Sequence, residues 1–209
     1  MANAAATVFL VDDDASVRRA LARLIKSAGH QVQTFASARE FLDSDWRAYG
    51  PACLVLDVRI PGLSGLDLQR ELQTEKAALP IIFITGHGDI PMSVKAMKDG
   101  AVDFLPKPVK QTDLFRAIEQ ALARAVSDRA ERETLEDIQS RIDTLTPRER
   151  EVMALVVRGL LNKQIAFELG TVEKTIKVHR ARVMEKMQAG SLAELVRLAD
   201  RIGMPAKKQ

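Results

Sequence analysis

The sequence of 209 residues has little of what secreted and membrane proteins need. Its one cysteine, Cys53, excludes an internal disulfide and favours a reducing compartment. The N-terminal segment has no basic region, and Asp12, Asp13 and Asp14 end its apolar run, so a signal peptide is not expected. No apolar run approaches the roughly 18 residues of a membrane-spanning helix. These absences predict a soluble, cytoplasmic protein.

Hydrophobic residues make up 46% and charged residues 28% of the chain, which is ordinary globular usage and excludes a disordered or collagen-like chain. The net charge of +3 is unevenly distributed. Residues 1–124 hold 15 basic and 15 acidic side chains, residues 125–143 hold 3 and 6, and residues 144–209 hold 13 and 7. We therefore predict a neutral domain, an acidic linker and a basic domain with these bounds. The basic domain points to nucleic acid, with a merely solvated basic surface as the alternative.

The first of these parts alternates β-rich and helical segments. Continuous apolar runs suit strands buried on both faces of a parallel sheet, and amphipathic segments lie between them. This alternation predicts an α/β domain with a doubly wound sheet, whose ligand site lies beyond the carboxyl ends of the strands. The expected strands are Thr7–Val11, Gln31–Phe35, Cys53–Leu56, Ile81–Thr85 and a segment around Val102–Leu105.

Polar residues stand at the ends of four expected strands. Asp12 and Asp13 follow the first, Asp57 the third, Thr85 ends the fourth, and Lys107 follows the fifth. Because parallel strands end at one edge, these side chains should converge there. Carboxylates this close repel one another unless a cation joins them, and hard oxygen ligands favour Mg²⁺. The set predicts a phosphoryl-transfer site with Asp57 as nucleophile, although each residue alone has an ordinary structural alternative.

These residues lie in motifs that resemble the response-regulator receiver domain, over residues 7–124. The resemblance implies a CheY-like, flavodoxin-like fold with five parallel strands. It also implies that a sensor histidine kinase phosphorylates Asp57. The motifs are Val11-Asp12-Asp13, Leu56-Asp57-Val58-Arg59-Ile60-Pro61-Gly62, Ile84-Thr85-Gly86-His87-Gly88 and Leu105-Pro106-Lys107-Pro108.

The resemblance assigns ligand roles at this site. Asp12, Asp13 and Asp57 would bind Mg²⁺ together with the backbone carbonyl of Arg59. Lys107 would bind the phosphoryl group, and the bond between it and the following proline resembles the cis peptide of the family.

The resemblance also implies a switch. Thr85 would move to bond the phosphoryl group, and Phe104 would turn inward with it. The surface of the fourth helix and fifth strand would then change, and in this family that surface commonly dimerises. Arg59 and His87, which stand two residues after Asp57 and Thr85, are expected to tune the lifetime of the phosphoryl group.

The basic C-terminal part has no strand signals, and its capping residues predict four short helices in a small all-α domain. Capping boxes are expected at Thr146–Glu149 and Ser191–Glu194. Asn162 and Thr171 are the predicted N-caps of the second and third helices.

The second and third helices are typical of a helix-turn-helix. Ile176, Val183 and Met187 give helix 172–187 an apolar side, and its opposite side is cationic, which suits insertion into the major groove of DNA. A solvated charged helix face is the alternative. The predicted DNA-contacting residues are Lys163, Lys174, Lys177, Val178, Arg180, Ala181 and Arg182.

Residues 144–205 resemble the LuxR-type four-helix DNA-binding domain, and together with the receiver they resemble FixJ-type regulators of the wider NarL-like group. This implies a transcriptional regulator, not an enzyme, that binds promoter DNA, forms a homodimer on phosphorylation and contacts RNA polymerase. The fourth helix, Leu192–Ile202, often dimerises in this family. The motifs are Leu145-Thr146-Pro147-Arg148-Glu149-Arg150-Glu151-Val152, Gly159-Leu160-Leu161-Asn162-Lys163-Gln164-Ile165-Ala166 and Thr175-Ile176-Lys177-Val178-His179-Arg180.

Residues 125–143 are rich in helix formers and predict a helical linker that extends the last receiver helix. A dimerising coiled coil is the alternative, although Arg129 and Arg132 interrupt its apolar stripe. The stripe consists of Leu135, Ile138, Ile142 and Leu145.

Three other functions compete with this interpretation. A Mg²⁺-dependent phosphatase or phosphotransferase would also use Asp57 as nucleophile, but Arg59 stands where the common Asp-x-Asp arrangement has its second aspartate. A small-molecule-sensing LuxR-type regulator would have no use for the acidic cluster. An atypical regulator that is not phosphorylated is disfavoured, because all five site residues are present.

Overall fold

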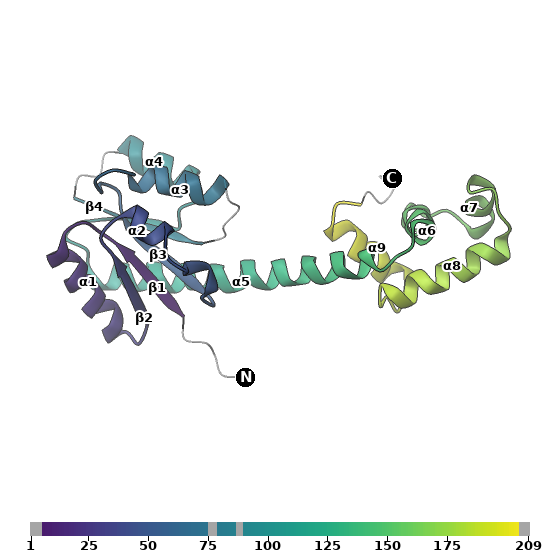
Figure 1. Ribbon diagram of the computed structural model, residues 1–209, viewed down its shortest axis with the longest axis horizontal. Helices are drawn as coiled ribbons and strands as arrows, with labels where there is room; N and C mark the ends of the chain where they lie inside the picture. The colour runs from purple at the N-terminus through teal and green to yellow at the C-terminus, as the bar shows by residue number, and fades with distance from the viewer. Residues whose placement is uncertain (1–5, 75–78, 87–89, 205–209) are drawn as a thin grey trace. The chain divides into compact units, whose positions relative to one another are not determined.

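The computed structural model describes residues 6–74, 79–86 and 90–204. Its contacts divide the chain into two compact units, Met1–Arg129 and Ala130–Gln209 (Figure 1). Within the described residues, no helix is both long enough and apolar enough to span a membrane.

Five parallel strands form the sheet of the N-terminal unit: β1 (Thr7–Val11), β2 (Gln31–Phe35), β3 (Ala52–Asp57), β4 (Ile81–Thr85) and β5 (Asp103–Pro106). Their order in the sheet is β2-β1-β3-β4-β5. The chain therefore winds outward in both directions from β1 and β3. β1, β3 and β4 coincide with apolar runs of the sequence and are buried along their length, whereas the edge strand β2 is largely polar and partly exposed. The predicted doubly wound fold is confirmed.

Helices cover both faces of this sheet because alternate strand residues enter two separate cores. Leu10 and Val55 pack in one core with α1 and α5, whereas Phe9 and Leu54 pack in the other with α2, α3 and α4 (Figure 1). All four side chains are fully buried. The helical elements are α1 (Ala15–Ser27), α2 (Ala38–Leu42), the 3-10 turn η1 (Trp46–Ala48), α3 (Gly65–Thr74), α4 (Ile90–Lys98) and α5 (Gln111–Asp143).

The described residues of the C-terminal unit form helices joined by short turns and no strand. The end of α5 and four further helices enclose one apolar core. The predicted all-α domain is confirmed. The four helices are α6 (Pro147–Val157), α7 (Asn162–Glu168), α8 (Glu173–Lys186) and α9 (Leu192–Arg201).

Side-chain caps begin two of these helices as the sequence predicts. The Thr146 hydroxyl accepts from the Glu149 N–H at 3.3 Å, and the Glu149 carboxylate accepts from the Thr146 N–H at 2.9 Å. At α9, Ser191 accepts from the Glu194 N–H at 3.2 Å. The Glu194 carboxylate bonds the N–H of Gly190 at 2.9 Å, one residue earlier than in a capping box.

The predicted N-caps Asn162 and Thr171 are wrong by one residue, since Leu161 and Val172 occupy the cap positions. At α7 the side chain of Gln164 reaches back and accepts from the Leu161 N–H at 2.8 Å, so the cap residue itself needs no polar side chain. The N–H of Thr171 instead closes the turn that follows α7.

The apolar stripe at the end of α5 packs inside the C-terminal unit. Ile138, Ile142 and Leu145 are 1%, 4% and 4% exposed, and they share the core formed with α6 to α9. Leu135 is half-buried. The stripe is therefore covered by side chains of the same chain, which argues against the coiled-coil alternative.

Gly65, the first residue of α3, is pressed against the backbone of β3. A Cβ atom at this position would lie 2.5 Å from the carbonyl oxygen of Asp57 and 3.1 Å from the Cα atom of Val58. We expect Gly65→Ala to lower the free energy of unfolding by about 1–3 kcal/mol, because backbone atoms must shift to admit the methyl group. Urea denaturation measures this change.

The matched control is Gly86→Ala, since a Cβ atom there meets no atom of the described residues within 4 Å. This control should not destabilise the protein. Equal stability of the two variants would contradict the close approach of α3 to β3.

Candidate functional site

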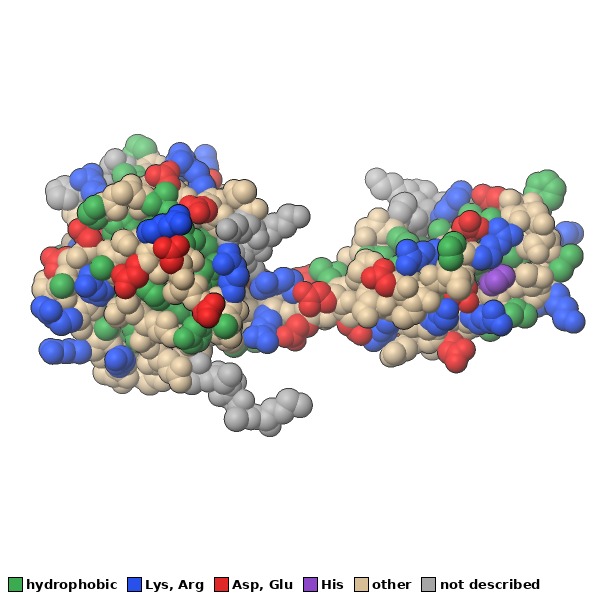
Figure 2. All heavy atoms as spheres, viewed as in Figure 1, with side chains coloured by type: hydrophobic (Ala, Val, Ile, Leu, Met, Phe, Trp, Pro, Cys, Tyr) green, Lys and Arg blue, Asp and Glu red, His purple; other side chains and the backbone are tan. Residues whose placement is uncertain are grey.

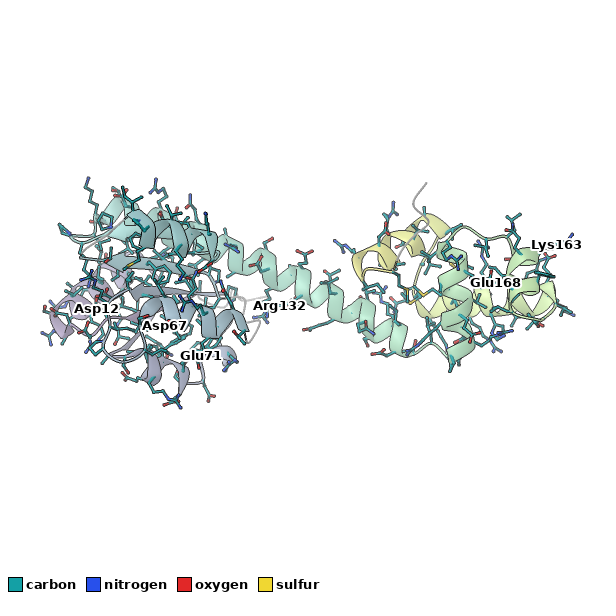
Figure 3. All side chains as sticks on the ribbon, turned by 90° about the horizontal axis from the view of Figure 1, so that it is seen from above. Asp12, Asp67, Glu71, Arg132, Lys163 and Glu168 are labelled. Carbon is teal, nitrogen blue, oxygen red and sulfur yellow. The ribbon has the colours of Figure 1, made fainter. Side chains whose placement is uncertain are left out.

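The carboxylates that the sequence places at strand ends meet at one edge of the sheet. Asp12 directly follows β1, and Asp57 is the last residue of β3. Carboxylate oxygens of Asp12, Asp13 and Asp57 all lie within 4.8 Å of one another. Asp12 and Asp57 are buried, whereas Asp13 is exposed; Asp12 is labelled in Figure 3.

Lys107 joins two of these carboxylates. Its Nζ atom lies 2.7 Å from Oδ2 of Asp12 and 2.6 Å from Oδ2 of Asp57. Residue Lys107 follows β5, so a single ammonium connects residues from the ends of three strands. The structure thus brings together the carboxylates and the amine that the strand ends predict.

Burial and ion pairing compete at this cluster. Burial raises the pKa of Asp12 above its ordinary value, although the hydrogen bond from Lys107 acts in the opposite direction. Burial alone would lower the pKa of Lys107, but its hydrogen bonds to Asp12 and Asp57 outweigh that effect and raise it. Lys107 therefore remains charged, and its ammonium is shared by two of the three carboxylates.

Thr85 lies beside this cluster, and Phe104 lies on β5, the strand that Lys107 follows. Thr85 ends β4 and is 1% exposed, and its carbonyl oxygen accepts from the Lys107 N–H at 2.7 Å. Phe104 is half-buried, with its ring centroid 6.1 Å from that of Phe83. The peptide bond Lys107–Pro108 is cis, as the sequence resemblance implied.

Arg18 is a site residue that the sequence patterns do not reveal. Its guanidinium donates to the carbonyl oxygen of Asp12 at 2.6 Å and to that of Asp13 at 3.3 Å. These bonds fix the backbone that carries two of the three carboxylates. Its place in the first turns of α1 is the only signal, and it is too general to identify such a contact.

A cavity of about 450 Å³ opens beside the cluster. Arg59 is exposed at its wall, and the Arg59 N–H donates to Oδ1 of Asp57 at 3.0 Å. His87, the other residue expected to affect the lifetime of the phosphoryl group, lies outside the described residues. The cavity is lined by Asp13, Val58, Arg59, Ile60, Pro61, Ser64, Leu66 and Met92.

In the C-terminal unit, α7, a turn and α8 form the expected helix-turn-helix. Ile176 and Val183 are buried on one side of α8. Blue Lys and Arg side chains lie along the α8 side of this unit (Figure 2), and Lys163 lies at the surface of α7 (Figure 3). Six of the seven predicted DNA-contacting residues are exposed: Lys163, Lys174, Lys177, Val178, Ala181 and Arg182.

The seventh predicted residue, Arg180, is only half-exposed. Its guanidinium donates to the side-chain oxygen of Asn162 at 3.2 Å, which ties α8 to the start of α7. Arg180 is therefore placed to hold the two helices together. Lys177 lies 3.3 Å from Glu173 on the same face of α8.

Three large apolar side chains near the helix-turn-helix are exposed, which the sequence does not predict. Leu161, Phe167 and Val172 are 69%, 92% and 65% exposed. Periodicity alone cannot identify these side chains as exposed, because apolar residues in short helices are normally expected in the core.

Comparisons with known proteins agree with both units. Residues 8–119 match the family described as "Response regulator receiver domain", and residues 143–199 match "Bacterial regulatory proteins, luxR family". The chain is 51% identical to nodulation protein W of Bradyrhizobium diazoefficiens over 205 residues, which cover 98% of this chain and 90% of that protein. It is 46% identical to the transcriptional regulatory protein FixJ of the same organism over 198 residues, which cover 94% and 96%.

Among solved structures, the response regulator StyR is 49% identical with a TM-score of 0.82, over 95% of this chain and 100% of that one. The acidic sheet edge and the helix-turn-helix thus define a receiver domain joined to a LuxR-type DNA-binding domain. The chain belongs to the two-component response regulators, in the group of transcriptional regulators that includes FixJ.

Glu149 bonds Lys186, the last residue of α8, and so supports the C-terminal end of that helix. The hydrogen bond from Lys186, at 2.7 Å, and that from the Thr146 N–H lower the pKa of Glu149 to about 2. Because this pKa lies below its ordinary value of 4.5, the stabilisation is complete above pH 4.5 and is lost as the pH falls toward 2. We expect Glu149→Gln to lower the free energy of unfolding by about 1–3 kcal/mol at neutral pH.

Urea denaturation at pH 7 and at about pH 3 measures this effect, and the difference from wild type should shrink at the lower pH. Glu151→Gln is the control, because its ion pair with Arg148 lies at the surface and is worth at most about 1 kcal/mol. A Glu149→Gln deficit that does not change between the two pH values would contradict the assigned ion pair.

Proposed function

We propose that Asp57 accepts a phosphoryl group from a sensor histidine kinase. The observation that carries this proposal is the position of Lys107 Nζ between Asp12 and Asp57, at 2.7 and 2.6 Å. A carboxylate oxygen of Asp57 would attack phosphorus, while the bond from phosphorus to the donor breaks and the donor leaves with the electron pair. Lys107 would then neutralise the phosphoryl oxygens, and its raised pKa keeps it charged.

We propose that Asp12, Asp13 and Asp57 hold Mg²⁺, with the backbone carbonyl of Arg59 as a further ligand. Three carboxylate oxygens within 4.8 Å of one another form a set of hard donors, and one ammonium does not balance their charge. When bound, Mg²⁺ supplies positive charge opposite the oxygens of the transferred group. Asp13 is the exposed member of the set, so it would present its carboxylate from the solvent side.

We propose that phosphorylation changes the surface formed by α4 and β5. The phosphoryl group carries more charge than the carboxylate, and the Thr85 hydroxyl would donate to it as the end of β4 moves inward. Phe104 would then occupy the space that this movement opens. Ile90, Val94 and Met97 are 78%, 44% and 44% exposed at one-turn spacing on α4, and this apolar row supports a homodimer contact there.

The DNA-binding unit would place α8 in the major groove of promoter DNA. The exposed Lys174 and Arg182, with Lys163 from α7, would hold phosphates, while Lys177 and Val178 would reach base edges. A kinase-controlled transcription factor of this kind would act in the cytoplasm and contact RNA polymerase.

The phosphoryl acceptor is tested by incubating the full chain with acetyl phosphate and Mg²⁺. We expect one phosphoryl group on the wild type by mass spectrometry and none on Asp57→Asn. Asp13→Asn should be labelled more slowly because a proposed Mg²⁺ ligand is lost.

Asp14→Asn is the matched control. Its carboxylate caps α1 at 2.7 Å from the Ser16 N–H, and asparagine caps equally well, so this variant should be labelled like the wild type. Equal labelling of Asp57→Asn and wild type would overturn the assignment.

The DNA-reading role of α8 is tested with a duplex that the wild-type chain selects from a random pool. Lys177→Ala should weaken binding by about 1–3 kcal/mol through loss of a base contact. Lys174→Ala should instead weaken selected and scrambled duplexes alike and reduce the salt dependence of binding. Unchanged binding by Lys177→Ala would exclude this helix face as the reading surface.

A further inference from the structure

The C-terminal end of α8 is held by the last residues of α5. The Arg141 guanidinium donates through Nη1 to the carbonyl oxygen of Met187, the C-cap residue of α8, at 3.1 Å. In the reverse direction, Nζ of Lys186 donates to the carbonyl oxygen of Thr144 at 2.9 Å. A cation at a helix C-terminus bonds free carbonyl groups and complements the helix dipole.

Arg141 belongs to a segment that lies outside both family matches, which cover residues 8–119 and 143–199. Ile138 and Ile142 nevertheless lie in the same apolar core as α8. The structure therefore makes the end of α5 an integral part of the DNA-binding unit.

Arg141 is a costly residue at this position. Its side chain is 24% exposed, and Nη2 pairs with Asp137 at 2.5 Å. Among the described residues, however, its Nε atom is buried without a hydrogen-bond partner. An apolar side chain would fill the same space without leaving a buried donor unpaired. What the arginine supplies, and an apolar side chain would not, is the ion pair with Asp137 and the directed bond to the end of α8.

The position of that end decides where the base-reading side chains lie. At about 1.5 Å per residue, Lys177 and Val178 lie about 15 Å along α8 from Met187. A tilt of about 5° at Met187 would move them by about 1 Å, which is enough to lengthen a base hydrogen bond beyond its useful range. Seven residues before Met187, α8 is also held to α7 by the bond from Arg180 to Asn162.

We propose that Arg141 is a positioning residue for sequence-specific DNA binding, which acts by fixing the orientation of α8. This inference rests on the proposed role of α8 in reading bases. Specific binding needs the reading side chains in register, whereas non-specific binding needs only positive charge near the phosphates. Loss of the Arg141 bond should therefore reduce affinity for a selected sequence and leave binding to other sequences nearly unchanged.

The test uses the full chain and two duplexes of equal length and base composition, one selected by the wild type and one scrambled. Arg141→Met should weaken binding to the selected duplex at least fivefold, the lower end of typical coupling between sites, and binding to the scrambled duplex less than about twofold. Arg132→Met removes the same charge from an exposed position on α5 and is the matched control (Figure 3). It should leave the ratio of the two affinities unchanged.

A merely structural role would lower the melting temperature without changing the affinity ratio of the folded protein. Asp137→Asn keeps Arg141 and the apolar core but removes the charge that orients the guanidinium, so it should reduce the same ratio to a smaller extent. If Arg141→Met does not fold, Asp137→Asn still tests whether Arg141 positions α8.

Equal weakening on both duplexes, or no weakening on either, would overturn the inference. Lys177→Ala, measured beside these variants, separates the two claims. If Lys177→Ala reduces specific binding and the Arg141 and Asp137 variants do not, α8 reads DNA without help from the Arg141 bond; if Lys177→Ala has no effect, the reading role of α8 itself is wrong.

Discussion

The ion pairs of Lys107 with Asp12 and Asp57 are the interaction on which the receiver unit depends. They join residues from the ends of β1, β3 and β5, so the charges of three strands are fixed at one point of the sheet edge. Without this ammonium, less would oppose the burial that already raises the pKa of Asp12. With it, negative charge still exceeds positive charge. The charge balance at this edge would therefore change if a further cation bound there or if the charge on Asp57 were redistributed.

A comparable arrangement supports the DNA-binding unit. Lys186 bonds both the Glu149 carboxylate, at the start of α6, and the carbonyl of Thr144, the residue after α5. Glu149 is 1% exposed and ionised across the physiological range, since its pKa is about 2. In both units the helices and strands are formed by apolar burial, while a lysine fixes the position of elements that carry the functional side chains. Helix packing alone would leave these elements freer to tilt.

Most of the fold could be predicted from the sequence, because strands buried on both faces must be apolar along their length, as in Ala52–Asp57 and Ile81–Thr85. The acidic cluster could be predicted because parallel topology alone places the strand ends together. Contacts that depend on distant backbone could not. The approach of Gly65 to Asp57 and the bonds of Arg18 have no local pattern. The stripe at Ile138 and Ile142 shows an apolar face but not its partner, which proved to be the core of the same unit.

We propose that a charge change at Asp57 alters DNA binding by a separate unit of the chain. The most direct measurement is the affinity of the full chain for its selected duplex, at fixed salt, before and after treatment with acetyl phosphate and Mg²⁺. Treatment should raise the affinity of the wild type and leave that of Asp57→Asn unchanged. An equal response of both proteins, or no response of the wild type once its phosphorylation has been verified, would contradict the claim.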